Sequence, residues 1–207
     1  MSLEFVLASH NAKKVREFQR IIGERMPQAV VHEYDGPEPV EDGVTFAENA
    51  LIKARRAAEH TGRIALADDS GIVVDVLGAA PGILSARWAG HTAGDEANVR
   101  LLLDQVSDIS RPHRGAEFRC TIALVVPPTL LDGGHEYVAE GHWRGTLAYE
   151  PRGSNGFGYD PIFEPEGLEV TAAELRPEEK DAQSHRARAF AELLPELERI
   201  AALLPAG

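Results

Sequence analysis

The chain has 207 residues, about 1.4 times the length of a typical domain, which predicts one large domain or two lobes. Its 33 acidic and 21 basic residues give a formal net charge of -12 at pH 7, so broad electrostatic binding to nucleic acid or to an anionic membrane is not expected. The single cysteine, Cys120, excludes an intrachain disulfide and a cysteine-based zinc site. The start of the chain lacks the basic region of a signal peptide, and no apolar run approaches ~20 residues, so the sequence predicts a cytoplasmic protein without a membrane span.

The first part of the chain predicts a strand, a polar segment and a helix. Residues 3–8 form a short apolar strand, and Ser9-His-Asn-Ala-Lys-Lys14 separates it from a helix that Gly23 is expected to end. The apolar face of this helix consists of Val15, Phe18, Ile21 and Ile22. A second strand is predicted over residues 29–34, and an acidic loop rich in turn residues follows over residues 35–43.

A second helix is predicted from a capping box, in which Thr45 is followed three residues later by Glu48. Gly62 is expected to end it. Its inner face is built mainly of small side chains, which predicts close packing: Ala47, Ala50, Leu51, Ala54, Ala57 and Ala58. Asn49, Lys53 and Arg56 share a different stripe of the same helix.

Two adjacent carboxylates follow the next predicted strand. Residues 64–68 are expected to form a strand that ends in Asp68-Asp69-Ser70-Gly71. Open α/β sheets bind ligands at the carboxyl ends of their strands. The position of Asp68 and Asp69 is therefore that of a functional site.

The remaining elements are predicted from periodicity and turn residues. Residues 72–77 continue as a strand, 78–90 form a Gly/Ala/Pro loop, and 95–106 form a helix. Residues 119–126 and 136–143 are expected to be antiparallel strands. A final helix covers residues 184–204, where Pro195 is expected to kink or divide it.

The acidic residues Glu41, Asp42, Asp68 and Asp69 offer only oxygen ligands, which suit Mg²⁺ bound through one or two carboxylates and substrate phosphates. The alternative is that Glu41 and Asp42 are solvated loop charges and that Asp68 caps a turn. Spacing by itself does not separate these two interpretations.

A glycine-rich segment carries the second candidate site. Gly153, Gly156 and Gly158 allow close approach of the backbone to a ligand and could set the ring of Phe157 beside a base, although a plain turn explains them equally. No P-loop or correctly placed dinucleotide motif occurs. His185 and Arg186 could donate hydrogen bonds to a ligand or could be surface residues of the last helix.

Taken together, five ordered segments resemble the non-canonical purine nucleoside triphosphate pyrophosphatases, also called inosine triphosphate pyrophosphatases or XTP/dITP diphosphatases. The resemblance runs nearly end to end. The segments are Ser9-x-Asn-x-x-Lys14, Thr45-Phe-x-Glu-Asn-Ala-x-x-Lys53-Ala, Ala67-Asp-Asp-Ser-Gly71 with the run to Arg87, Gly156-Phe-Gly-Tyr-Asp-Pro-Ile-Phe163, and Ser184-His-Arg186. His10 and Trp88 depart from the family pattern.

The resemblance implies hydrolysis of ITP, dITP and XTP to the monophosphate and pyrophosphate with Mg²⁺. It also implies a dimer and an elongated, two-lobed α/β fold in one domain over 1–207, with a mixed sheet, flanking helices and a central cleft. Glu41 and Asp69 would hold the metal, and Asp69 would also accept the proton of the attacking water, with Lys53 and Asp68 in support.

The remaining implied roles concern the substrate. The triphosphate would bind Ser9, Asn11 and Lys14, Phe157 would stack on the base, and the base edge would be read by Asp160, Lys180, His185 and Arg186. Ser70, Gly158 and Tyr159 lie within the same motifs and complete the predicted substrate-binding set. Only four of the 21 basic residues are lysines, and three of them, all except Lys13, fall on these positions.

Two other functions are compatible with parts of the sequence. A pyrophosphatase of the related septum-inhibitor-like family would act on pyrimidine or modified nucleotides, but its signatures are not those around Gly156 and Ser184. A catalytically silent nucleotide sensor would bind purines without hydrolysis. The intact Asp68-Asp69 pair argues against a sensor, which needs no proton acceptor.

Overall fold

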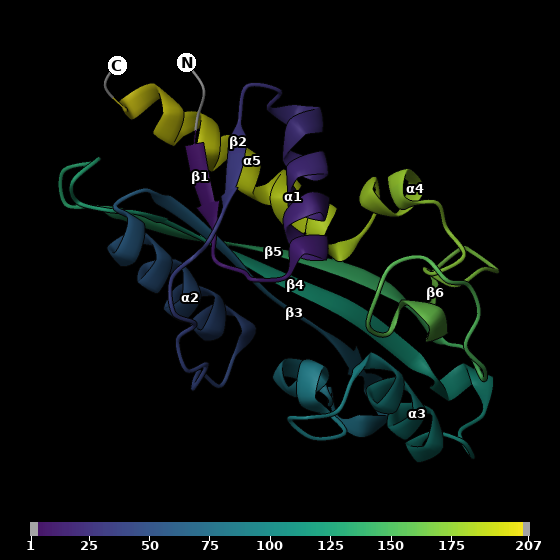
Figure 1. The fold of residues 1–207 in the computed structure, drawn as a ribbon. Coiled ribbons are helices and arrows are strands. Elements are labelled where there is room, and N and C mark those ends of the chain that lie inside the picture. The colour runs from purple at the N-terminus through teal and green to yellow at the C-terminus, as the bar shows by residue number, and fades with distance from the viewer. Residues whose placement is uncertain (1–3, 205–207) are drawn as a thin grey trace. The chain divides into compact units, whose positions relative to one another are not determined.

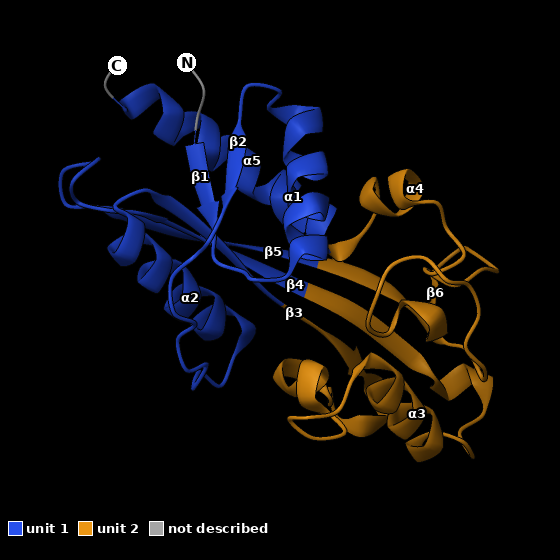
Figure 2. Cartoon of the chain, in the orientation of Figure 1, with its two compact units in different colours: residues 1–69, 120–141, 186–207 blue, residues 70–119, 142–185 orange. Residues whose placement is uncertain are grey.

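A computed structural model describes residues 4–204 of the chain. It divides into two compact units (Figure 2): unit 1 comprises residues 1–69, 120–141 and 186–207, and unit 2 comprises residues 70–119 and 142–185. The predicted first strand begins at residue 3, which lies outside the described residues. The chain start, on which the signal-peptide prediction depends, also lies outside them.

The strands form one six-stranded mixed sheet in the order β2-β1-β3-β4-β5-β6 (Figure 1). In unit 1, β1 (Glu4–Leu7) is parallel to both β2 (Val30–Glu33) and β3 (Ile64–Val74). In unit 2, the end of β5 (His135–Leu147) is antiparallel to β6 (Phe163–Pro165). β4 (Gly115–Val126) contributes residues to both units. The predicted α/β class with a mixed sheet is therefore confirmed.

The core of unit 1 follows from the two-residue period of its strands. Phe5 and Leu7 of β1 face α1 (Ala12–Arg25) and α5 (His185–Leu203), whereas Val6 faces α2 (Phe46–Thr61). The predicted alanine face of α2 is buried against this second side of the sheet at Ala50, Ala54, Ala57 and Ala58. Small side chains there let the helix approach the strands closely.

Unit 2 has its own core. It contains Ile72 and Val74 of β3, together with residues of α3 (Asp95–Gln105) and aromatic residues that include Trp143 and Phe163. The short helix α4 (Pro177–Asp181) also belongs to unit 2. The predicted loop over residues 78–90 contains a 3-10 helix, Gly82–Arg87, and the Trp88 ring that follows it packs against this core.

The structure bears on two predictions about helix continuity, and the one for Gly23 is wrong. α1 continues past Gly23 to Arg25, because Met26 is drawn into the same core and its N–H donates to the carbonyl of Ile22 at 2.7 Å. α5 is one helix through Pro195, which is exposed, so the proline does not divide it and the alternative of a kink stays a prediction. Leu193 and Leu197, on either side of the proline, are fully buried, and this packing offsets the hydrogen bond that proline cannot make.

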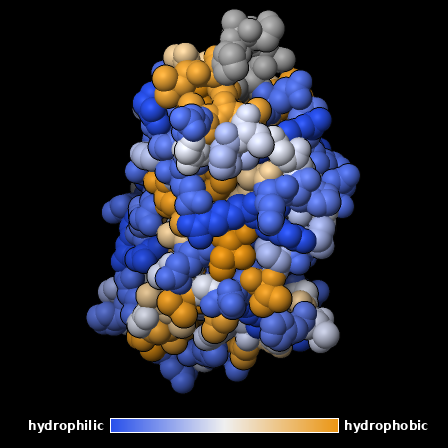
Figure 3. Space-filling view, turned by 90° about the vertical axis from the view of Figure 1, so that its left-hand side faces the viewer, coloured by the Kyte–Doolittle hydropathy of each residue, from blue (hydrophilic) through white to orange (hydrophobic). Residues whose placement is uncertain are grey.

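The surface agrees with the charged composition. On the face shown in Figure 3, hydrophobic residues lie in several patches separated by hydrophilic ones. None of the helices within residues 4–204 is both long and apolar enough to cross a membrane.

Candidate active site

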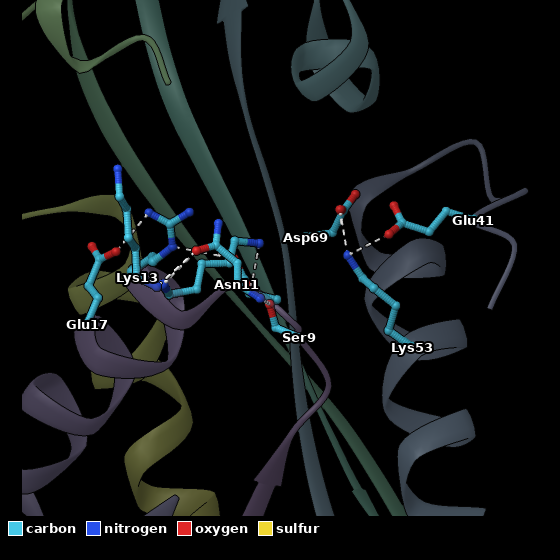
Figure 4. A network of polar contacts seen from close by, with 10 residues as sticks. Ser9, Asn11, Lys13, Glu17, Glu41, Lys53 and Asp69 are labelled. Atoms are coloured by element: carbon cyan, nitrogen blue, oxygen red, sulfur yellow. Dashed lines mark hydrogen bonds and ion pairs between the residues drawn. The ribbon is translucent and has the colours of Figure 1, made fainter. Parts of the chain in front are cut away.

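The polar segment from Ser9 to Lys14 follows β1 and begins α1. Asn11 caps this helix, since its Oδ1 accepts hydrogen bonds from the main-chain N–H groups of Lys13 (3.0 Å) and Lys14 (3.4 Å). Ser9 Oγ accepts a further bond from the N–H of Asn11 (3.2 Å; Figure 4). The predicted phosphate-binding residues Ser9, Asn11 and Lys14 thus lie at a helix N-terminus, whose partial positive charge favours an anion.

The aspartate pair does not end its strand, contrary to the prediction. β3 continues through Asp68 and Asp69 to Val74, because its place between β1 and β4 keeps the Ser-Gly pair that follows in extended conformation. It is β1 that ends, at Leu7, opposite Leu66. The two carboxylates therefore extend beyond the carboxyl end of β1, which is where parallel sheets place their ligands.

Asp68 lies on the side of the sheet covered by α1 and α5. It is only 2% exposed, and two cations contact it: Lys14 Nζ lies 2.9 Å from Oδ1, and Arg186 Nε lies 3.4 Å from Oδ2. The same guanidinium reaches Glu17 of α1, with Nη1 at 3.4 Å from Oε2. The structure thus places Arg186, which was predicted to read the base edge, beside the predicted phosphate-binding residue Lys14 and orients it with two carboxylates.

Asp69 points to the opposite side, toward α2, because successive side chains of a strand alternate. Its Oδ1 accepts a hydrogen bond from Lys53 Nζ at 2.9 Å, and the same ammonium lies 3.4 Å from Glu41 Oε1 (Figure 4). Asn49 Nδ2 lies 3.4 Å from the other oxygen of Asp69, and its Oδ1 accepts the N–H of Gly43 at 2.9 Å. α2 therefore supplies two side chains that hold Asp69 and the acidic loop together.

The charges of this group shift its proton affinities. Burial raises the pKa of Asp69, and Glu41 and Asp68 act in the same direction, against the lowering effect of Lys53. Burial acts to lower the pKa of Lys53, but the negative charges of Asp69, Asp68 and Glu41 outweigh it and the pKa is raised. Asp69 is thus a stronger proton acceptor than an exposed carboxylate, beside a lysine that stays charged.

The donor set fits Mg²⁺. Glu41 and Asp69 already converge on one cation, the ammonium of Lys53, and both offer carboxylate oxygens. Asp42, the remaining acidic residue of the predicted set, is exposed. Within residues 4–204, no three His, Cys, Asp or Glu side chains are grouped to hold a metal by themselves. Mg²⁺ commonly fills its coordination with water and substrate phosphates.

In unit 2, the glycine-rich segment folds around a buried ion pair. Asp160 Oδ2 accepts hydrogen bonds from Lys180 Nζ at 2.6 Å and from the N–H of Phe157 at 2.8 Å. The same ammonium lies 5.2 Å from the centre of the half-buried Phe157 ring. The structure thus brings together Phe157, Asp160 and Lys180, three of the residues predicted to bind the base.

The other predicted residues of unit 2 have different surroundings. The Tyr159 hydroxyl donates to the carbonyl of Ser85 at 2.8 Å, and burial raises its pKa. The N–H of Gly158 donates to Asp95 Oδ2 at 2.8 Å. His185 is buried with its ring stacked on Phe118 at 4.8 Å. Ser70 is half-buried within β3.

Three residues of these sites were not assigned a role from sequence. Glu17 is an acid within the apolar stripe of α1, and this break in the pattern is the one signal that could have revealed it. Asn49 lies within the quoted helix motif, and its contact with Asp69 was not anticipated. Asp95 begins α3 and holds Gly158, 63 residues away, so no local pattern indicates it.

We expect Gly156→Ala to destabilise the glycine-rich segment more than Gly158→Ala. Both glycines have positive φ, +76° and +61°, so alanine at either costs about 1–2 kcal/mol of conformational energy. Only at Gly156 would the new Cβ also collide with the Asp160 carboxylate. The free energy of unfolding should therefore fall by about 3 kcal/mol for Gly156→Ala and by about 1 kcal/mol for Gly158→Ala. Equal losses of unfolding free energy for the two variants, measured by urea denaturation, would contradict the predicted collision with Asp160.

Comparison with known proteins agrees with this geometry. The model of the Ham1 family matches residues 5–196 of the chain. Over 192 residues the chain is 59% identical to a dITP/XTP pyrophosphatase of Leifsonia xyli subsp. xyli, covering 93% of this chain and 94% of that protein.

Solved structures give the same result. A HAM1 protein from Coxiella burnetii is similar with a TM-score of 0.83 at 42% identity, over 95% of this chain and 99% of that one. A nucleoside-triphosphatase, or dITP/XTP pyrophosphatase, from Mycobacterium abscessus has a TM-score of 0.73 at 49% identity, over 93% of this chain and 100% of that one. The chain therefore belongs to the Ham1 family, and the family membership predicted from its five ordered segments is confirmed.

Proposed function

We propose that this chain hydrolyses non-canonical purine nucleoside triphosphates, namely ITP, dITP and XTP, to the nucleoside monophosphate and pyrophosphate. The observation that carries the proposal is the pair of neighbouring carboxylates in β3. Asp68 holds the ammonium of Lys14 from the phosphate-binding segment, and Asp69 holds that of Lys53 beside Glu41. Attack on a tetra-anionic triphosphate needs fixed cations for the phosphates and a carboxylate for the proton of water.

In this proposal Asp69 accepts the proton of the attacking water. Its raised pKa suits that role, and Lys53 and Asn49 fix the orientation of its two oxygens. Glu41 and Asp69 would hold Mg²⁺. When bound, the cation would neutralise phosphate charge and help to orient the water.

The phosphates are assigned to Ser9, Asn11 and Lys14. A buried carboxylate among groups that bind an anionic phosphate needs a reason, because it repels the phosphate. The reason proposed for Asp68 is that it positions the Lys14 ammonium. Arg186 is also assigned to substrate binding, and Asp68 and Glu17 orient its guanidinium.

The base is assigned to unit 2. Phe157 would stack on the purine, and Lys180 would donate to its 6-oxygen, with Asp160 fixing the ammonium. His185, Ser70, Gly158 and Tyr159 complete the set, although the Tyr159 hydroxyl is already bound to the main chain. An obligate donor such as Lys180 has no acceptor for the amino group of adenine, and this mismatch favours 6-keto bases.

An assay of released phosphate species tests the function. The protein is incubated with Mg²⁺ and ITP, dITP, XTP, GTP, ATP or dTTP, and pyrophosphate and orthophosphate are measured separately. We expect pyrophosphate as the product, with a much higher kcat/KM for ITP, dITP and XTP than for GTP, ATP and dTTP. A sensor would release neither product, a phosphatase would release orthophosphate, and a septum-inhibitor-like enzyme would favour dTTP.

Replacing the stacking ring tests the division between binding and specificity. Phe157→Ala should lower kcat/KM for ITP, GTP and ATP by the same factor, equivalent to about 1–3 kcal/mol, because every purine offers a π-face. Phe157→Tyr, which keeps the ring, is the matched control. A change of more than about threefold in the ITP to ATP ratio would show that the ring also selects the base.

The whole chain is proposed to act as one pyrophosphatase domain, because the family model matches residues 5–196 without a break. A cytoplasmic site of action belongs to the same proposal, because the cellular nucleotide pool is its substrate.

We further propose a homodimer that uses the segment from Gly78 to Gly90. Leu84 is 43% exposed there, and Val76 just before it is 46% exposed. Sedimentation should give twice the 22.5 kDa of one chain, and Leu84→Glu should give the monomer because it places a charge in the contact. A wild-type protein that sediments as a monomer at micromolar concentration would contradict the dimer.

A further inference from the structure

His10 has no part in the function proposed above, although it lies between two of the assigned phosphate-binding residues. The main chain and side chains of Ser9 and Asn11 are engaged in starting α1. The His10 ring instead stacks on Tyr34, with ring centroids 5.7 Å apart and planes inclined by 10°. Its Nδ1 lies 3.1 Å from Glu38 Oε1. His10 therefore joins the segment Ser9–Lys14 to the acidic loop of residues 35–43.

Tyr34 is a fixed support for this contact. It is buried in the α2 side of the unit 1 core, and its hydroxyl donates to the carbonyl of Pro37 at 3.1 Å. His60 of α2 packs edge-on against it at 5.6 Å. The chain at Gly36 passes so close to the hydroxyl that a Cβ there would collide with it. The acidic loop thus begins on a buried ring that is held by a hydrogen bond and by ring packing.

The far end of the acidic loop is held separately. Asn49 and Glu48 of α2 accept the N–H groups of Gly43 and Val44 at 2.9 Å and 2.6 Å. Between the two ends the loop has little packing, since Val40 is 80% exposed. Glu41 lies in this lightly packed part, so its position depends on how firmly both ends are held.

We propose that His10 is a positioning residue that couples the phosphate-binding segment to the acidic loop and so sets the place of Glu41. The role of Glu41 as a metal ligand rests on the proposed function, whereas the coupling itself rests on the contacts of His10 alone. The stack on Tyr34 and the contact with Glu38 both tie His10 to the start of the acidic loop, so they keep the proposed phosphate-binding groups and Glu41 in one relative arrangement before any ligand arrives.

Amide hydrogen exchange in the free protein tests the coupling without substrate or metal. His10→Ala should speed exchange in residues 35–43 by about 3- to 10-fold, the size expected for losing one exposed polar contact and one ring stack. His10→Phe keeps the stack and should lose only part of this protection, as should Glu38→Gln. His60→Ala removes the other ring beside Tyr34 and a 3.8 Å contact with Asp35 at the start of the loop, but no contact with the segment Ser9–Lys14. It is therefore the matched control, and any change in its exchange should be confined to the residues next to Asp35.

Direct titration with Mn²⁺, followed by electron paramagnetic resonance without nucleotide, tests the effect on Glu41. His10→Ala should weaken Mn²⁺ binding by about 3- to 10-fold, with His10→Phe intermediate and His60→Ala within about twofold of wild type. Glu41→Gln serves as the reference for loss of the ligand.

Each outcome decides the proposal. The proposal would be overturned if His10→Ala left hydrogen exchange unchanged, or if it sped exchange without altering Mn²⁺ binding. It would also be overturned if His60→Ala had an equal effect, or if Glu41→Gln did not affect Mn²⁺ binding. Neither measurement needs turnover. A wild-type protein that releases no pyrophosphate would therefore refute the proposed function while these results still decide the role of His10.

Discussion

Asp69→Asn should reduce kcat for ITP by at least ~10³-fold, because it removes a proton acceptor and a metal ligand with one substitution. The amide cannot take a proton from water, and it offers the cation a neutral oxygen in place of a charged one. Steady-state release of pyrophosphate at saturating Mg²⁺ is the measurement. Nucleotide binding, followed with a non-hydrolysable ITP analogue, should persist because the phosphate and base contacts remain.

Two further variants separate the roles that Asp69 combines. Glu41→Gln removes only a metal ligand, so its activity should recover in part at high Mg²⁺, whereas that of Asp69→Asn should not. Asp42→Asn changes an exposed carboxylate of the same loop and should stay within about twofold of wild type. Retention of more than about a tenth of the wild-type rate by Asp69→Asn would remove Asp69 from the catalytic role.

The expected fall in kcat of Asp69→Asn does not arise from a loss of folding stability. Burial raises the pKa of Asp69, which means that the folded protein disfavours its charged form. A neutral amide of the same shape avoids that desolvation, which offsets part of the lost contact with Lys53. The midpoint of thermal unfolding should therefore change little.

The largest expected effect on stability comes from Arg114→Met. Arg114 is 1% exposed, and its guanidinium donates to four main-chain carbonyls, those of Val106, Ile109, Leu147 and Ala148. These hydrogen bonds join the end of α3 to the end of β5 within unit 2. Methionine fills the volume but leaves the carbonyls without donors, which should cost at least about 3 kcal/mol.

Arg144→Met is the matched control in the same unit. Arg144 pairs with Asp75 through Nη1 and Nη2 of its guanidinium, yet both side chains are nearly half exposed. Exposed pairs of this kind contribute about 0–1 kcal/mol. Urea denaturation should therefore separate the two variants clearly, and a difference below about 1 kcal/mol would show that the Arg114 carbonyls find other donors or water.

Local patterns in the sequence determined the ends and the buried face of the second helix. The N-cap at Thr45, the glycine that ends the second helix at Gly62 and the alanine face between them could be predicted because each depends on neighbours within a few residues. Only the second half of the predicted capping box differs, since Glu48 Oε2 accepts the N–H of Val44 in place of that of Thr45. The ordered segments also identified the family. They did so because catalysis and phosphate binding require particular side chains at particular places along the chain.

Tertiary structure alone decided where the two aspartates lie. A strand continues through Ser-Gly when strands on both sides support it, and no local pattern reports those neighbours. Continuation of β3 places Asp68 and Asp69 beyond the end of β1 and on opposite sides of the sheet, each with its own lysine.

The buried charges were also decided by the fold. Glu17 meets Arg186 across 169 residues of sequence, and Arg114 meets the carbonyls of Leu147 and Ala148 across 33 and 34 residues. A charge is retained in a protein interior only where partners compensate its desolvation. Those partners come together only when the chain folds, so the sequence shows the charged residue and the tertiary structure decides whether it is buried.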